Sequence, residues 1–174
     1  MITVYTVTIL DTVWAVKSYS QKNDKTYPDR REKAKSAVRC REIYYCGNDM
    51  STQFFTASVA EELLLNTGLT EKNKDRTRHL LKEFGLYEYR DAHPSALSGG
   101  QKQRLAIACA IFSGRRILIL DEPTSGFDGQ NMRLIAERLK SEAWHGRTIL
   151  VLTHDRELIE SCCDNVVEAE KRSP

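Results

Sequence analysis

The stretch Leu97–Asp128, LSGGQKQRLAIACAIFSGRRILILDEPTSGFD, says more about fold and function than any other part of the chain. It opens with a Ser-Gly-Gly turn and continues into a helix-forming segment. An aliphatic run follows, and a turn that begins with two adjacent carboxylates comes directly after it. Because these parts follow one another without interruption, we interpret them together.

The two regular parts of this stretch predict a helix and a buried strand. Gln101–Phe112 is strongly helical, and Leu105, Ala108, Cys109 and Phe112 fall on one face at helical spacing. Residues 117–120 are uniformly aliphatic, as expected of a strand buried on both faces of a parallel sheet.

The rest of the chain continues the alternation of strands and helices. Ser58 with Glu61 forms a capping-box pattern that predicts a helix starting near Val59. We expect further strands over residues 2–16, 41–46, 148–152 and 166–167, and further helices over residues 72–83, 131–142 and 155–163. Residues 33–41 fit either a short helix or a loop. The fold class is therefore α/β with a mostly parallel sheet, and the helical stretch 59–96 is expected to form a subdomain.

Composition narrows the class of protein. The 174 residues are 41% hydrophobic and 29% charged with a net charge of +2, which suits a globular domain and gives no sign of nucleic-acid binding. Five cysteines without metal-type spacing indicate reduced thiols. No apolar run approaches the ~20 residues that span a bilayer. The N-terminal stretch carries Asp11 and no basic leader, so it is a poor signal peptide.

Asp121 and Glu122 directly follow the aliphatic strand, at the edge of an open α/β sheet where ligands bind. One carboxylate there can hold a hydrated Mg²⁺, and its neighbour can orient and polarise an attacking water. Taken alone, the pair also fits a solvated turn that caps the next segment.

Ser98, Gly99 and Gly100 precede the helix and leave backbone N–H groups open to close approach. At a helix N-terminus such groups form an anion site that the helix dipole reinforces. The alternative is an ordinary N-cap with a flexible lead-in.

Together these residues resemble the ABC-type ATPases. LSGGQKQR (97–104) is similar to their signature motif, and ILILDEPTSGFD (117–128) to their Walker B strand and D-loop. LTHD (152–155) resembles the segment of their switch histidine, and the resemblance covers about residues 40 to 168. SGFDGQNM, THDRELIESCCD and QFFT (53–56) resemble the ATPase subunits of energy-coupling factor (ECF) transporters, which take up vitamins and metal ions in prokaryotes.

This resemblance implies a partial ABC-type nucleotide-binding domain with ATP and Mg²⁺ as cofactors. Asp121 would support Mg²⁺ through water, Glu122 would act on the attacking water, and His154 would sense the γ-phosphate. Asp128 would help to link two sites across a dimer. The signature residues would meet the γ-phosphate of an ATP held by the opposing subunit; they are Ser98, Gly99, Gly100 and Gln101.

Two positions depart from the family pattern. The Q-loop glutamine falls near Asn48, whose amide oxygen is one methylene shorter as a Mg²⁺ ligand. The first glycine is Gly47 and no glycine precedes a lysine, so no Walker A loop of the form G-x-x-x-x-G-K-S/T exists in this sequence.

Two explanations of the absent Walker A loop stay open. The chain is a truncated or frame-disrupted ABC ATPase in which residues 1 to about 30 are not homologous, or it is a degenerate subunit that lends its signature face to a complete partner. We expect a divergent segment over residues 1–40, the partial ATPase domain over 41–168 with a helical subdomain over 59–96, and a tail over 169–174.

The partners implied are a second ABC ATPase subunit, as a homo- or heterodimer, and a transmembrane transporter subunit, at the cytoplasmic face of a prokaryotic membrane. A non-catalytic docking protein is a second class of function. A soluble ABC protein acting on DNA or ribosomes is a third, but the long coiled coils or paired cassettes of those proteins are absent from this sequence. Nucleic acid is not an expected partner.

Overall fold

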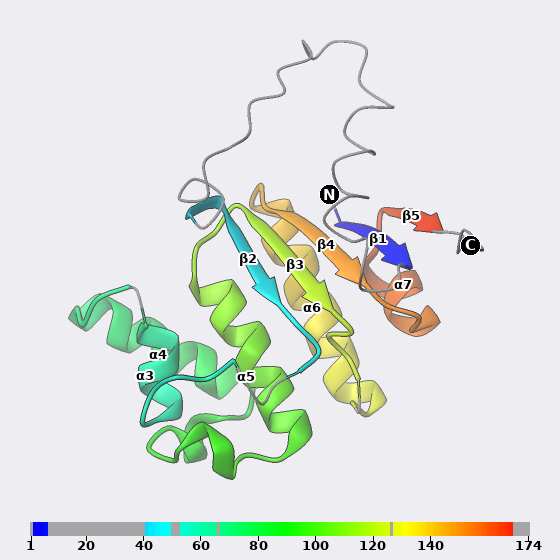
Figure 1. The fold of residues 1–174 in the computed structure, drawn as a ribbon. Helices are drawn as coiled ribbons and strands as arrows, with labels where there is room; N and C mark the ends of the chain where they lie inside the picture. The colour runs from blue at the N-terminus through cyan, green and yellow to red at the C-terminus, as the bar shows by residue number, and fades with distance from the viewer. Residues whose placement is uncertain (1, 7–40, 50–52, 66, 126, 169–174) are drawn as a thin grey trace, which may run out of the picture.

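The computed structural model describes residues 2–6, 41–49, 53–65, 67–125 and 127–168. Its strands form one five-stranded sheet in the order β2-β3-β4-β1-β5, and all neighbours run parallel (Figure 1). The strands are β1 (Ile2–Thr6), β2 (Ile43–Cys46), β3 (Ile117–Asp121), β4 (Thr148–Leu152) and β5 (Asn165–Glu168). The predicted α/β class with a parallel sheet is confirmed.

Strand β1, which falls within the strand predicted over residues 2–16 and in the segment expected to be divergent, lies inside the sheet between β4 and β5. Val4 is aligned with Val151 of β4 on one side and with Val166 of β5 on the other. Because the strands are parallel, the carboxyl end of β1 lies at the same edge of the sheet as those of β3 and β4. The remaining predictions for residues 7–40 fall outside the described residues.

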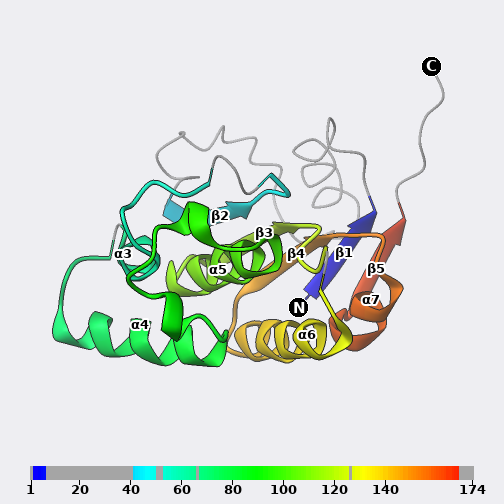
Figure 2. The same ribbon diagram turned by 90° about the horizontal axis from the view of Figure 1, so that it is seen from below.

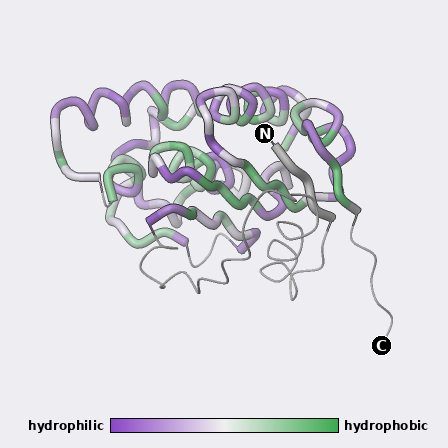
Figure 3. Tube along the Cα trace, turned by 90° about the horizontal axis from the view of Figure 1, so that it is seen from above, coloured by the Kyte–Doolittle hydropathy of each residue, from purple (hydrophilic) through white to green (hydrophobic). Residues whose placement is uncertain are grey.

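The long helices cover one face of the sheet. Helices α5 (Gly99–Phe112), α6 (Gly129–Trp144) and α7 (Arg156–Cys162) lie on the same side of the strands in Figure 2. Alternate residues of the strands point into this layer, so Leu118 and Leu120 join the main core cluster with residues of all three helices. Figure 3 shows the hydrophobic stretches gathered in the strands and in α5.

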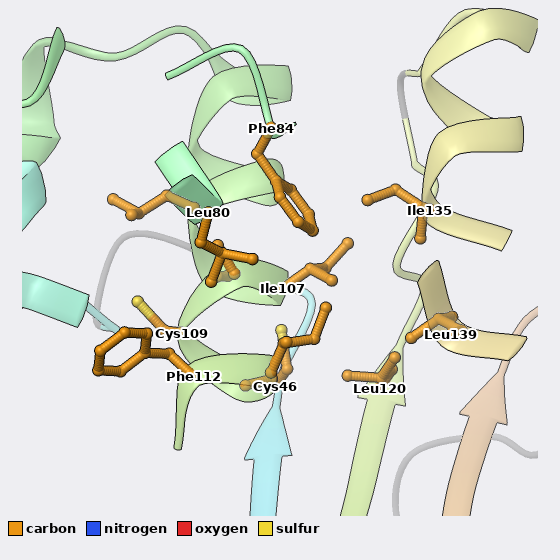
Figure 4. Packing of buried hydrophobic residues seen from close by; sticks show 14 of the residues in the cluster. Cys46, Leu80, Phe84, Ile107, Cys109, Phe112, Leu120, Ile135 and Leu139 are labelled. Carbon is orange, nitrogen blue, oxygen red and sulfur yellow. The ribbon is translucent and has the colours of Figure 1, made fainter. Parts of the chain in front are cut away.

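Helix α5 is buried almost all round, so the four residues predicted to share one face are buried together with their neighbours on the other faces. Every residue from Leu105 to Phe112 is buried, and so is Gln103. The reason is that α5 packs against β2 on one side and against α3 (Val59–Leu64) and α4 (Glu71–Glu83) on the other. Figure 4 shows Ile107 of α5 among Leu80 and Phe84 from the helical segment and Ile135 from α6.

The helical segment follows the predicted boundaries closely. Ser58 caps α3 by accepting a hydrogen bond from the Glu61 amide, and Thr70 caps α4 in the same way from Asn73. Gly85, directly after the C-cap of α4, has a φ of 63°, a backbone conformation that favours glycine. Two short 3₁₀ turns, η2 (Tyr87–Tyr89) and η3 (Pro94–Ala96), lead to α5.

Two further observations bear on function. The described cysteines Cys46, Cys109, Cys162 and Cys163 are free thiols, while Cys40 lies outside the described residues. Within the described ranges, no helix is both long enough and apolar enough to cross a bilayer.

Candidate functional site

The carboxyl ends of β3 and β4 bring the predicted carboxylates and histidine together. Asp121 is aligned with Leu152 in the ladder, so Glu122 leaves β3 beside Thr153 and His154, which leave β4. The backbone N–H of Glu122 donates to the Leu152 carbonyl at 2.8 Å, which extends the contact one residue beyond the strand. We call the set Asp121, Glu122, Thr153 and His154 the carboxylate edge.

The Glu122 carboxylate is held by two neighbours from β4. One oxygen accepts a hydrogen bond from the Thr153 hydroxyl at 3.0 Å, and the other lies 2.7 Å from Nδ1 of His154. Glu122 has a φ of 48°, a left-handed conformation that is uncommon for residues other than glycine. Such strain persists where the surrounding structure fixes it, and it is concentrated at functional sites.

Asp121 is buried, with 5% of its surface exposed. Burial raises the pKa of its carboxyl, the hydrogen bond from the Tyr45 hydroxyl at 3.1 Å lowers it, and the charge of Glu122 raises it again. The hydrogen bond with Glu122, and then the charge of that carboxylate, raise the pKa of His154. The edge therefore places the buried carboxylate of Asp121 next to the partly exposed carboxylate of Glu122 and the exposed ring of His154.

The donor set suits a hard cation. Carboxylate, hydroxyl and amide oxygens are the ligands that Mg²⁺ takes, and two adjacent carboxylates of which one is buried favour a positive charge. Among the described residues, no cluster of three or more His, Cys, Asp or Glu side chains can hold a metal. A Mg²⁺ ion at this edge would therefore depend on water and phosphate oxygens for most of its ligands, as it commonly does.

Three contacts of the edge were missed from the sequence. Tyr45 of β2 reaches Asp121, Gln103 of α5 donates its side-chain N–H to the Glu122 carbonyl at 2.9 Å, and Thr124 donates to Asp155 at 2.8 Å. The segments LTHD and LSGGQKQR contained some of these residues, but only the strand and helix registers show which side chains meet.

The glycine turn before α5 differs from the carboxylate edge in its hydrogen bonding and exposure. Ser98 and Gln101 form a reciprocal capping box, in which the Ser98 amide donates to the Gln101 side chain at 2.8 Å. Ser98 and Gly99 are exposed, and a side chain added at Gly99 would meet no atom within 4 Å. We call Leu97–Gln101 the signature turn. The side-chain hydrogen bonds of Ser98 and Gln101 stay within the turn, and the first side-chain link from α5 to the carboxylate edge is made two residues later, by Gln103.

The two remaining predicted site residues are exposed and lie at element ends. Asp128 is the N-cap of α6 and accepts a hydrogen bond from the Asn131 amide at 2.8 Å. Asn48 lies two residues beyond β2, at the same edge of the sheet as Asp121, because Cys46 is aligned with Leu120. The structure thus brings Asp121, Glu122 and His154 into one cluster and holds Asp128 in a separate helix cap.

A second feature lies beside α3. A cavity of about 210 Å³ is lined by residues that include Tyr44, Phe55, Glu62 and Arg115. The buried carboxylate of Glu62 accepts hydrogen bonds from the Phe55 and Thr56 amides at 3.0 Å and from the Thr56 hydroxyl. Phe55 and Leu69 remain 78% and 73% exposed, which leaves apolar surface near this cavity.

Comparison with known proteins decides the family. The family model described as ABC transporter matches residues 15–125, which is more than half of the chain and includes the signature turn, Asp121 and Glu122. The chain belongs to the ABC transporter family. The match begins at residue 15, well before the residue 40 at which the motif resemblance starts, so it reaches into the segment that we expected to be divergent.

Relatives of this ABC protein are described as ATP-binding proteins. A putative ABC transporter ATP-binding protein of Treponema denticola is 38% identical over 130 residues, covering 75% of this chain and 26% of the relative. A putative HMP/thiamine import ATP-binding protein of Bacillus subtilis is 37% identical over 115 residues, covering 66% of this chain and 21% of the relative. The chain spans about a fifth to a half of the length of such curated relatives.

Solved structures share the fold. The protein cbiO1 of Clostridium perfringens, described as part of the ABC transporter complex cbiONQ, has a TM-score of 0.68 and 27% identity over 96% of this chain and 72% of that chain. A dimeric ATP-binding cassette bound to ADP and Pi has a TM-score of 0.74 and 21% identity, covering 98% of this chain and 81% of its own. The second likeness concerns the fold alone.

Proposed function

We propose that this chain is the ATP-binding subunit of an ABC importer of the ECF type, in which its ATP site is shared with a second chain. The observation that carries the proposal is the contrast in hydrogen bonding between the two halves of the site. The carboxylate edge is assembled at the ends of β2, β3 and β4, whereas in the signature turn Ser98 and Gln101 bond to each other, and Ser98 and Gly99 are exposed.

Each residue then has a chemical role. Glu122 would accept a proton from the attacking water, because its carboxylate is already oriented by Thr153 and His154. Asp121 and Asn48 would hold Mg²⁺, which neutralises phosphate charge when bound. His154 would contact the γ-phosphate. Gln101 lies in the signature turn, where the helix N-terminus would face the phosphate of a neighbouring subunit, and Asp128 would help to link the two sites.

The phosphate cradle itself would come from another chain. No G-x-x-x-x-G-K-S/T loop occurs in the 174 residues, so this sequence supplies no Walker A lysine. In a pair with a Walker A-bearing subunit, the signature turn of this chain would meet ATP bound in the partner. A truncated form of a complete ATPase and a degenerate subunit both predict this dependence on a partner.

The cavity beside α3 suits contact with a transmembrane subunit. The exposed side chains of Phe55 and Leu69 offer apolar surface, and Glu62 holds the segment that carries Phe55. Vitamins and metal ions are the substrates that the ECF resemblance implies, and the relative named for HMP/thiamine import agrees with that range. The location would be the cytoplasmic face of the membrane.

A second candidate is a non-catalytic subunit that only donates its signature turn. It is favoured by the absent Walker A loop, and it makes a different prediction for Glu122. If this chain takes part in hydrolysis at its own edge, Glu122→Gln lowers ATP turnover by the assembled complex. If the chain only donates the turn, Glu122→Gln leaves turnover unchanged.

The experiment compares Glu122→Gln with Gly99→Asp in a complex of this chain with a Walker A-bearing ABC ATPase. An aspartate in the first turn of α5 suits the helix dipole and meets no neighbour, but its charge opposes a phosphate. We expect Gly99→Asp to reduce turnover strongly under both candidates. Unchanged turnover in both variants would contradict the proposal of a shared site.

A further inference from the structure

Cys162 and Cys163 form a pair of neighbouring thiols at the end of α7. Their Sγ atoms lie 3.7 Å apart. Cys162 is the last helical residue and belongs to the main core cluster, with 2% of its surface exposed. Cys163, the C-cap, is only half-buried. Solvent therefore reaches the Cys163 thiol, whereas the adjacent Cys162 thiol is buried.

The two thiols also differ chemically. The hydrogen bond from Cys162 lowers the pKa of Cys163, because it stabilises the Cys163 thiolate. The thiolate is the form of cysteine that reacts with oxidants. Neither residue has a part in the ATP chemistry proposed above.

We propose that Cys163 and Cys162 form a reversible oxidation site, which a peroxide converts into a disulfide between the two adjacent residues. Redox-sensitive cysteines share these features, namely an accessible thiolate and a resolving thiol beside it. The other described thiols differ, since Cys46 and Cys109 are both buried.

The chemistry balances in two steps. The Cys163 thiolate attacks one oxygen of hydrogen peroxide, the O–O bond breaks, and hydroxide leaves and is protonated to water, so that Cys163 becomes a sulfenic acid. The Cys162 sulfur then attacks the Cys163 sulfur, the S–O bond breaks, and a second water leaves with the Cys162 proton. Overall two thiols are oxidised, and one peroxide is reduced to two waters.

The product is expected to be easily reduced. Adjacent Cα atoms lie about 3.8 Å apart across a trans peptide, below the range of about 4.4–6.8 Å that disulfides usually adopt. Strained disulfides have more oxidising potentials and are the labile ones. The bond therefore suits a reversible modification rather than a permanent link.

Oxidation of the two cysteines would alter the hydrogen bonding of α7. The single proton of the Cys162 thiol can be donated to the Cys163 sulfur or to the Leu158 carbonyl, which lies at 3.2 Å, and the disulfide removes this proton from a helix of seven residues. The other end of α7 is capped by Asp155, which also accepts the hydrogen bond from Thr124 and directly follows His154. The disulfide would therefore change the last turn of α7, whose first turn directly follows His154 of the carboxylate edge.

The test is oxidation of the full chain with hydrogen peroxide, followed by trypsin and mass spectrometry. Cleavage after Arg156 and Lys171 releases both cysteines in one peptide of residues 157–171. We expect this peptide to lose the mass of two hydrogen atoms and to regain it with dithiothreitol. A peptide that stays reduced, gains only oxygen, or is linked to another cysteine would overturn the proposal.

Variants separate the two roles. Cys163→Ser should leave Cys162 unoxidised at the same peroxide dose, because Cys162 is buried. Cys162→Ser should stop at a sulfenic acid on Cys163 that dimedone traps. Ser161→Ala, in the same turn, is the matched control and should oxidise like the unmodified chain. Oxidation of Cys162 at the full rate in Cys163→Ser contradicts the assigned order.

Discussion

The carboxylate edge and the signature turn are constructed in opposite ways. At the edge, residues from three strands converge, Asp121 is buried, and Glu122 adopts a left-handed backbone under contacts from β4 and α5. In the signature turn, Ser98 and Gln101 satisfy each other while Gly99 stays open to solvent. The contacts of the edge are made within the chain, whereas Gly99 in the turn is free to contact a second protein chain.

This difference predicts where substitutions act. Changes at the edge should lower the stability of the fold, because core residues and buried hydrogen bonds support it. Changes in the exposed part of the turn should lower stability less and affect association with a nucleotide-loaded partner. The link between the regions, Gln103, should belong to the first group.

The largest loss of stability is expected when a core side chain next to the carboxylates is removed. Leu120 is fully buried directly before Asp121, so Leu120→Ala should lower the free energy of unfolding by about 2–5 kcal/mol. Urea denaturation measures this. The control is Leu69→Ala, which is 73% exposed and should change stability by less than about 0.5 kcal/mol. Equal losses of folding free energy in Leu120→Ala and Leu69→Ala would contradict the claim that the core supports the carboxylate edge.

The next effect is the loss of the link between the two regions. Gln103→Ala leaves the Glu122 carbonyl without its side-chain donor, which should cost about 1–3 kcal/mol of folding free energy. Lys102→Ala, one residue earlier, is the control, because Lys102 is only half-buried. A Gln103 variant as stable as the Lys102 variant would show that the edge does not depend on α5.

A smaller effect is expected in the signature turn. Ser98→Ala removes half of the capping box and should lower stability by about 1 kcal/mol. Gly99→Ala should leave stability unchanged or raise it by up to about 1 kcal/mol, since the added carbon meets no neighbour in the helix. Thermal unfolding compares the two. Destabilisation by Gly99→Ala would mean that the turn is packed rather than open.

The smallest effect concerns His154, whose side chain is 85% exposed. Its pKa is raised in the folded chain by Glu122, so protonation of His154 favours folding below its ordinary pKa of about 6.5, and this contribution is lost as the pH rises through the raised value. Glu122→Gln should return the pKa of His154 toward its ordinary value in an NMR titration. An identical titration curve in both chains would contradict the contact.

Sequence reasoning located Asp121, Glu122 and His154 correctly at neighbouring strand ends because uniform aliphatic runs mark parallel strands. It missed Tyr45, since the register between β2 and β3 decides which side chain faces Asp121. It predicted the shared face of α5 but not the burial of its second side, which depends on α3 and α4. The position of β1 between β4 and β5 depends on long-range pairing that no local pattern contains.

The most direct test of the shared site is Mg-ATP binding by the purified chain alone, measured by isothermal titration calorimetry. Because the sequence has no Walker A lysine and its signature turn faces outward, we expect no saturable binding at micromolar nucleotide. Binding should appear when a Walker A-bearing ABC ATPase is added, and Gly99→Asp should then weaken ATP-dependent association. Tight Mg-ATP binding by the isolated chain would contradict the shared site.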